Sequence, residues 1–189
     1  MDAEHKDILL EKYEEFNLEE DQARKKLLRL EIFNILKEVE EPDSDDSHIW
    51  GLTHYMSDDD KEYNRNQALE KFLEAYKLDS TNFLACLYAA HCFHDMGELQ
   101  SALKYYERVN KTELKEFQIW RYVKLIEQIG FCHYKLGNQS QGRKQFQKVL
   151  EWYRKLPIDD RAVPTEMFQC LPDSDDLIIK MKEIEDYLE

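Results

Sequence analysis

The chain has 189 residues and a formal charge of −14, with 40 Asp and Glu against 26 Lys and Arg. This acidic balance repels phosphate backbones and anionic membrane surfaces, which argues against nucleic-acid or membrane binding and favours a basic protein partner. The 42% of hydrophobic residues can supply a core. Five Gly, four Pro, five Val and four Thr, against abundant Leu, Glu, Lys and Ala, predict an all-α protein.

Residues 1–41 predict a pair of helices. Leu9, Tyr13 and Phe16 recur at helical spacing, and residues 27–39 are so rich in apolar side chains that we expect the second helix to be buried on more than one side. Pro42 ends the pair. Residues 42–48 hold Asp and Ser but no large apolar side chain, and they predict an acidic linker.

Signals for membranes and for secretion are missing from the sequence. No apolar run approaches the roughly 20 residues that span a hydrocarbon core, and no apolar signal segment follows Met1. Cys86, Cys92, Cys132 and Cys170 form no CxxC pair, which predicts reduced thiols packed as small apolar groups. We therefore expect a cytoplasmic protein.

Residues 49–156 contain a repeated pattern of small and large side chains. A small residue is followed by a large one four positions later and by another small one three positions beyond, in Ala68/Phe72/Ala75, Ala102/Tyr106/Val109 and Gly142/Phe146/Val149. The first two copies lie 34 residues apart and the last two 40. The small residue lets two helices approach closely and the large one fills the gap beside them. We expect the six extra residues of the third copy to lengthen the helix before it.

This pattern resembles the tetratricopeptide repeat (TPR) family, whose unit is a helix hairpin of 34 residues. Met96-Gly97 and Leu136-Gly137 fall at the turns between helices, although the first copy has no glycine at the matching place. The resemblance implies an α-solenoid of stacked hairpins with capped ends. The N-terminal pair would cover one end. Residues 157–189 would cover the other, with an irregular connection, a short helical turn over 165–170 and an amphipathic helix over 173–189.

Catalytic motifs are missing from the sequence. It holds no GxSxG, no glycine-rich phosphate loop and no HExxH, so we expect a protein that is not an enzyme and uses no cofactor. Cys86, His91, Cys92 and His94, together with Cys132 and His133 on the next hairpin, could supply a zinc site. The interpretation we favour is that the cysteines pack in the core and that His91 and His94 are polar groove residues. The Asp runs lack the EF-hand glycine and fit helix caps better than calcium ligands.

The TPR resemblance also implies where a partner would bind. In proteins of this fold the first helix of each repeat lines the concave side, and aromatic anchors there carry interface energy. The residues at these places are Trp50, His54, Leu87, Tyr88, His91, His94, Lys124, Glu127, Gln128 and Tyr134. Any of them could instead pack between hairpins. The clamp for the carboxylate tails of heat-shock chaperones is matched only at Lys124, which argues against that subtype.

These features predict a non-enzymatic module that binds a basic protein partner in an aromatic-lined groove. Acidic steering suits an inhibitor that must capture a basic effector quickly, so an immunity protein that neutralises a toxin is the specific hypothesis. The alternatives are a chaperone similar to the small acidic TPR chaperones of type III secretion, which would hold an extended segment of a secreted client, and a regulatory scaffold.

Overall fold

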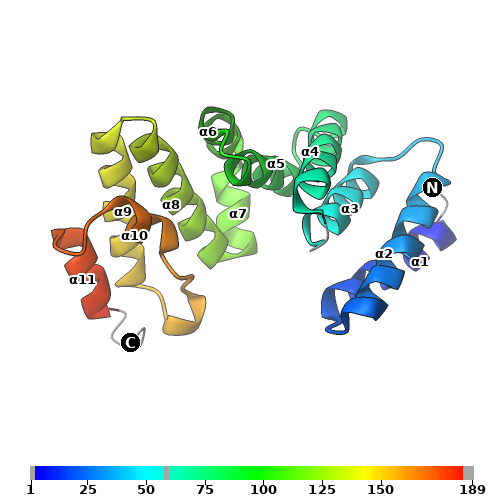
Figure 1. Cartoon of the computed structure of the whole chain (residues 1–189), viewed down its shortest axis with the longest axis horizontal. Helices are drawn as coiled ribbons and strands as arrows, with labels where there is room; N and C mark the ends of the chain where they lie inside the picture. The colour runs from blue at the N-terminus through cyan, green and yellow to red at the C-terminus, as the bar shows by residue number, and fades with distance from the viewer. Residues whose placement is uncertain (1–2, 58–59, 185–189) are drawn as a thin grey trace. The chain divides into compact units, whose positions relative to one another are not determined.

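The computed structural model describes residues 3–57 and 60–184, which contain helices and no strand (Figure 1). The helices in chain order are α1 (Ala3–Leu18), α2 (Gln22–Lys37), α3 (Ser44–Tyr55), α4 (Lys61–Leu78), α5 (Phe83–Asp95), α6 (Leu99–Arg108), α7 (Lys111–Phe117), α8 (Ile119–Lys135), α9 (Gln139–Tyr153), the 3-10 helix η1 (Ile158–Asp160), α10 (Thr165–Cys170) and α11 (Asp176–Ile184). The all-α prediction is confirmed.

The chain divides into two compact units, Met1–Cys92 and Phe93–Glu189, with the boundary inside α5. We call them unit 1 and unit 2. The core of unit 1 includes an apolar cluster from α1, α2 and α3, with Leu9, Phe16 and Ile32 among its members. The core of unit 2 surrounds Phe146 and Met167. Each unit therefore buries apolar side chains of its own.

The N-terminal pair is present as α1 and α2, which pack against each other. Asp21 caps α2 by accepting a hydrogen bond from the Arg24 backbone N–H at 2.7 Å. The expectation that α2 is buried on more than one side is wrong, because Leu27 and Leu30 are 53% and 47% exposed. In the described residues α2 packs on α1 and α3, and these two leucines lie away from those contacts.

The acidic segment 42–48 is not a linker throughout, since α3 begins at Ser44. Asp43 and Asp46 form a capping box, in which each side chain accepts a hydrogen bond from the other residue's backbone N–H, at 2.9 and 3.1 Å. Lys6 of α1 adds an ion pair with Asp43 at 2.6 Å. The Asp and Ser residues that suggested a loop therefore start a helix.

The repeated small and large residues occupy the places that the pattern predicts. Ala68, Phe72, Ala102, Tyr106, Gly142 and Phe146 all lie in the interior. A Cβ on Gly142 would lie 2.8 Å from the Gly130 carbonyl oxygen, so α8 and α9 approach too closely for any larger residue. Gly97 and Gly137 adopt positive φ values of 78° and 88° at the two hairpin turns.

The extra residues of the third copy form a separate helix as well as lengthening α8. Helix α7 begins where the Asn110 side chain accepts hydrogen bonds from the Thr112 and Glu113 backbone N–H groups. The C-terminal expectations are largely met: α10 spans 165–170, packs on α8 and is followed by α11, which packs on α9 (Figure 1). Residues 185–189 of the expected last helix lie outside the described residues.

Candidate partner-binding surfaces

The ten residues expected to bind a partner fall into two groups of five, one in each unit. Unit 1 holds Trp50, His54, Leu87, Tyr88 and His91, and unit 2 holds His94, Lys124, Glu127, Gln128 and Tyr134. Their role as a partner site stays a prediction. Their surroundings nonetheless differ, because some contribute to the protein's own packing and others remain accessible.

Tyr88 belongs to an aromatic cluster built by α3, α4 and α5. Its ring stacks on Phe72 with centroids 5.3 Å apart and meets Tyr55, His48 and His91 edge-on at 5.6 to 5.9 Å. Tyr88 and His91 are half-buried, whereas the adjacent Leu87 is buried. Burial lowers the pKa of His48 to about 4, so this ring is neutral at pH 7. Tyr88 therefore presents part of an uncharged aromatic surface.

Trp50 and His54 lie one helical turn apart on α3. The Trp50 ring lies 4.3 Å from the Lys71 ammonium and 6.4 Å from the Phe33 ring. His54 is buried, with its ring centroid 4.4 Å from that of Phe33 and its Nδ1 3.0 Å from the Asn64 side-chain oxygen. His54 thus supports the packing of α2 on α3, while half-buried Trp50 remains able to contact a ligand.

In unit 2, Lys124 of α8 binds the segment that enters α10. Its ammonium donates to the Val163 carbonyl at 2.9 Å and to the Thr165 hydroxyl at 3.0 Å, and it pairs with the Glu166 carboxylate. Glu127, one turn further along α8, accepts from Lys124 at 2.8 Å and from the Met167 backbone N–H at 2.9 Å. These two predicted site residues therefore bind the chain's own C-terminal region.

Burial perturbs the charges of this cluster. Glu127 is 1% exposed, and its desolvation raises the carboxyl pKa to about 7 although Lys124 opposes the change. Burial alone would raise the pKa of Glu166, but the nearby Lys124 outweighs it and the pKa is lowered. Two carboxylates thus share one ammonium, and Glu127 is the one that binds a proton near neutral pH.

The other three residues of this group also contact their own unit. His94 Nδ1 lies 3.2 Å from the Tyr106 hydroxyl, and burial lowers the pKa of this histidine. Gln128 is buried, and the half-buried Tyr134 lies with its ring 6.3 Å from that of Phe146. These three side chains of α5 and α8 are therefore packed within unit 2. They are not exposed and without contacts, as expected for residues that line a groove.

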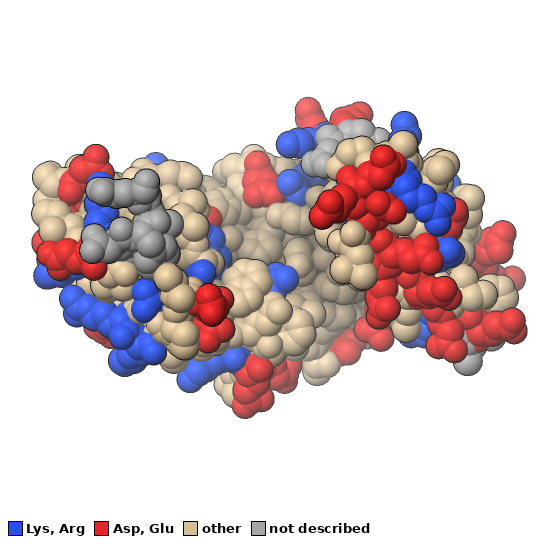
Figure 2. Space-filling view, turned by 90° about the horizontal axis from the view of Figure 1, so that it is seen from below, with Lys and Arg blue, Asp and Glu red and all other residues tan. Residues whose placement is uncertain are grey.

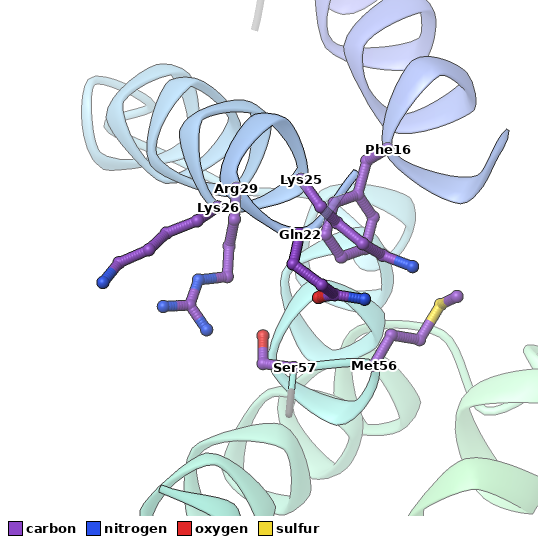
Figure 3. Close-up of a pocket in the computed structure, with 7 residues that line it drawn as sticks. All are labelled: Phe16, Gln22, Lys25, Lys26, Arg29, Met56 and Ser57. Carbon is purple, nitrogen blue, oxygen red and sulfur yellow. The ribbon is translucent and has the colours of Figure 1, made fainter. Parts of the chain in front are cut away.

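Sequence reasoning missed two adjoining cavities along α2. The first, of about 330 Å³, is lined by Phe16, Gln22, Lys25, Lys26, Arg29, Met56 and Ser57 (Figure 3). The second, of about 250 Å³, is lined by Arg29, Phe33, Lys37, Trp50, His54, Asp60, Tyr63, Asn64 and Gln67. Arg29 belongs to both. The signal that could have found them is the basic run Arg24-Lys25-Lys26 in an otherwise acidic region.

The negative charge is concentrated in unit 1. Residues 1–92 carry 23 Asp and Glu against 11 Lys and Arg, a net charge of −12, whereas residues 93–189 carry 17 against 15, a net charge of −2. Figure 2 shows acidic side chains crowded over the part of the surface that unit 1 forms, on the right. Any electrostatic attraction of a basic molecule therefore originates mainly from unit 1.

Neither metal chemistry nor a membrane span is indicated by the described part of the chain. Within 3–57 and 60–184, no three His, Cys, Asp or Glu side chains gather as a metal site. No disulfide joins the four cysteines, all of which lie in the described ranges, and three of them are buried. None of the described helices is both long and apolar enough to cross a bilayer.

The repeat pattern, the hairpins and their buried signature residues define the class of fold, an all-α, TPR-like helical repeat. Among solved structures the chain is similar to MamA, whose crystal structure is a TPR-like helical repeat, with a TM-score of 0.54 and 20% identity over 68% of this chain. The match spans 66% of the MamA chain, and at this identity it shows the fold alone. No family model and no curated protein matches the sequence.

Proposed function

We propose that the chain is a non-enzymatic protein-interaction module whose unit 1 binds a basic protein partner. The observation that carries the proposal is the concentration of the negative charge, −12 in unit 1 against −2 in unit 2. A helical-repeat fold supports this function because stacked hairpins expose extended surfaces to partners. Charge of one sign on one part of a surface speeds the encounter with a partner of the opposite sign.

One continuous stretch contributes most to this asymmetry. Residues 38–60 contain nine Asp and Glu and no Lys or Arg. Five of the nine are exposed between α2 and the first turn of α3: Glu38, Glu40, Glu41, Asp43 and Asp45. Lys6 pairs with Asp43 and lies 3.8 Å from Asp45, which leaves the three glutamates as the natural contacts for a basic surface.

The aromatic side chains of the same unit can add affinity at short range. Tyr88 and Trp50 are both half-buried and held by neighbouring rings, so binding costs them little side-chain entropy. Long-range attraction by carboxylates and short-range contact by rigid aromatic rings is the combination expected of a fast and specific binder. Within this class we propose an inhibitor that neutralises a basic toxin, as an immunity protein does. A chaperone for a secreted client is the alternative.

The test begins with capture of partners from a host lysate by the tagged full-length chain at low and high salt. The captured protein is then purified and titrated against two variants that each remove three negative charges. One carries Glu38→Gln, Glu40→Gln and Glu41→Gln in unit 1, and the control carries Glu116→Gln, Asp159→Asn and Glu183→Gln in unit 2.

We expect the unit 1 variant to associate about tenfold more slowly at low salt and the control to behave like the wild type. Equal effects of the two variants would reject unit 1 as the binding surface. A folded basic domain as partner supports the inhibitor, whereas binding only to unfolded segments of several clients supports the chaperone.

A further inference from the structure

Helix α2 carries apolar side chains on two opposite sides. Its inner side supplies Leu28, Ile32 and Leu36 to the apolar cluster that α2 forms with α1 and α3. Leu27 and Leu30 lie on the outer side and are exposed in the described structure. A helix that is apolar all round is typically covered on more than one side. The outer side of α2 is therefore a candidate for a contact with another molecule.

The two outer leucines belong to a stripe that runs along the helix. Ala23, Leu27, Leu30 and Asn34 recur at intervals of four, three and four residues, which is the spacing of the side chains between two packed helices. All four are exposed, and none of them is charged. We call these four residues the α2 outer stripe. Its spacing fits a second helix that lies along α2.

The outer side of α1 has a different composition. Its exposed residues include Glu4, Asp7, Glu11 and Glu14, which recur at intervals of three, four and three. A row of carboxylates is what a helix presents to water on its polar face. The neighbouring helix of the same pair thus has a charged outer row, and exposure to solvent does not explain the uncharged stripe of α2.

We propose that the α2 outer stripe binds the same stripe of a second copy of the chain, in an antiparallel pair of α2 helices related by a two-fold axis. With Leu27 opposite Leu30 of the second copy, Ala23 lies opposite its Asn34, and symmetry repeats both contacts. Each exposed leucine is then covered by the other copy. This self-association goes beyond the proposed function and does not depend on the basic partner.

The charges beside the stripe support a second copy as its occupant. Arg24 and Glu31 lie along one edge of the stripe and are both partly exposed. In the antiparallel pair, Arg24 of each copy lies about two residues, or roughly 3 Å along the axis, from Glu31 of the other. Arg24 also lies 3.5 Å from Glu15 of its own chain, but a guanidinium has five N–H donors and can bind a further carboxylate. The edge is therefore complementary to itself, as a two-fold interface requires.

The contact is small, so the dimer is expected to be weak. A helix of 16 residues is about 24 Å long and about 10 Å wide, which limits the contact to roughly 300 Å² per copy, below the roughly 800 Å² of a stable complex. The Lys26 side chains of the two copies share the other edge of the stripe and repel each other. We therefore expect a dissociation constant of about 10 to 100 μM.

Sedimentation equilibrium of the full chain tests the dimer directly. The apparent mass is measured from about 5 to 500 μM in about 0.15 M salt, which screens the repulsion between two acidic chains. We expect it to rise from the 22.8 kDa of one chain towards twice that mass. An apparent mass that stays at that of one chain over this range rejects the second copy as the occupant of the stripe.

Two substitutions in the stripe locate the contact. Leu27→Gln with Leu30→Gln keeps helix-forming residues at exposed positions and is expected to raise the dissociation constant at least tenfold. The matched control, Leu78→Gln with Ile179→Gln, replaces side chains that are 54% and 47% exposed and is expected to dimerise like the wild type. Equal effects of the two pairs, or no effect of the first, would reject the stripe as the interface.

Charge reversal tests the antiparallel arrangement. Arg24→Glu brings carboxylates together across the interface and Glu31→Arg brings guanidinium groups together, so each variant alone is expected to dimerise about three- to tenfold more weakly. In an equimolar mixture, unlike copies regain both ion pairs, and an affinity close to that of the wild type is expected. Mixing cannot repair contacts within one chain. A mixture that dimerises no better than its components therefore rejects the arrangement.

The outcomes bear separately on this inference and on the proposed function. If the chain stays monomeric and the leucine variant loses the basic partner, that partner covers the stripe and self-association is rejected. If the chain dimerises through the stripe and the variant that lacks the three glutamates still associates at the rate of the wild type, the dimer is retained and the basic-partner proposal is rejected.

Discussion

Replacing Glu127 with Gln tests whether the buried charge cluster of unit 2 is arranged as described. Burial raises the pKa of this carboxyl from its ordinary value of 4.5 to about 7. The folded state therefore holds the proton more tightly than the unfolded state, and the unfolding free energy falls as the pH rises between these values. The difference between the two pKa values corresponds to about 3 kcal/mol of unfolding free energy, of which about 2 to 3 kcal/mol is lost between pH 5 and pH 8.

In the Glu127→Gln variant the side chain at position 127 is uncharged at every pH. The variant therefore cannot lose this part of the unfolding free energy as the pH rises. Its side-chain oxygen can still accept from the Met167 N–H, and Lys124 keeps its pair with Glu166. Its absolute stability depends on how the new amide N–H₂ group meets the Lys124 ammonium. The change in its stability with pH does not depend on this contact. We expect the stability of the variant relative to the wild type to rise by about 2 to 3 kcal/mol from pH 5 to pH 8.

Urea unfolding between pH 5 and pH 8 measures this difference. Replacing Trp50 with Phe in both proteins leaves Trp120 and Trp152, both in unit 2, as the fluorescent reporters. Glu116→Gln, at an exposed position on α7, is the matched control and is expected to show no such trend. A stability difference that stays constant with pH, or that falls as the pH rises, would refute the assigned burial and proton binding of Glu127.

Two further substitutions test the packing and the aromatic surface. Gly142→Ala is expected to destabilise unit 2 by about 1 to 3 kcal/mol although Ala favours helix, because the new Cβ would lie 2.8 Å from the Gly130 oxygen and from the Tyr134 Cβ; urea unfolding checks this against the neutral control Gln141→Ala. Tyr88→Ala is expected to keep the helical far-UV spectrum and to weaken binding of the basic partner at least tenfold by calorimetry, and unchanged affinity would remove the aromatic cluster from the interface.

The repeat was predictable from the sequence because helix packing imposes a local spacing. A small residue and a large one four positions later must share a face of one helix, so Ala102 and Tyr106 identify the close contact without any knowledge of the fold. The first hairpin was harder to place. The connection between α3 and α4 is two residues longer than the other two, and α4 begins four residues further ahead of its large residue than α9 does, so Gly51 falls out of register with Gly130. In the structure Gly51 and Gly130 occupy equivalent places, since a Cβ on either glycine would clash with the large residue of the facing helix.

The start of α3 was mispredicted because segments rich in Asp and Ser occur both in loops and at the N-termini of helices. Asp and Ser are turn formers, and the same side chains are the best helix caps. The apolar residues that reveal the helix, Ile49 and Leu52, come only after its first turn. The buried Asp46 lies three residues after Asp43 and completes the capping box, whereas the exposed Asp45 lies two residues after it and does not.

The partner site was less predictable because contacts distant in sequence determine which side chains remain accessible. Lys124 and Glu127 looked like polar groove residues, yet both contact residues 163–167, about forty positions further along the chain. Periodicity places a residue on a helix face but does not say what covers that face. The same limit hid the two cavities along α2, whose walls come from α1, α2, α3 and α4.

The carboxylates and the aromatic rings of unit 1 lead to a salt dependence that distinguishes long-range attraction of a partner from short-range contact with it. The exposed glutamates of residues 38–41 act at long range, so added salt should screen them and slow association. The Tyr88 and Trp50 rings carry no charge and act at short range, so salt affects them little and their contribution appears mainly in dissociation. Salt should therefore lower the association rate more than it raises the dissociation rate. Substitution of Tyr88 should do the reverse, because it removes a contact made only after the partner has docked.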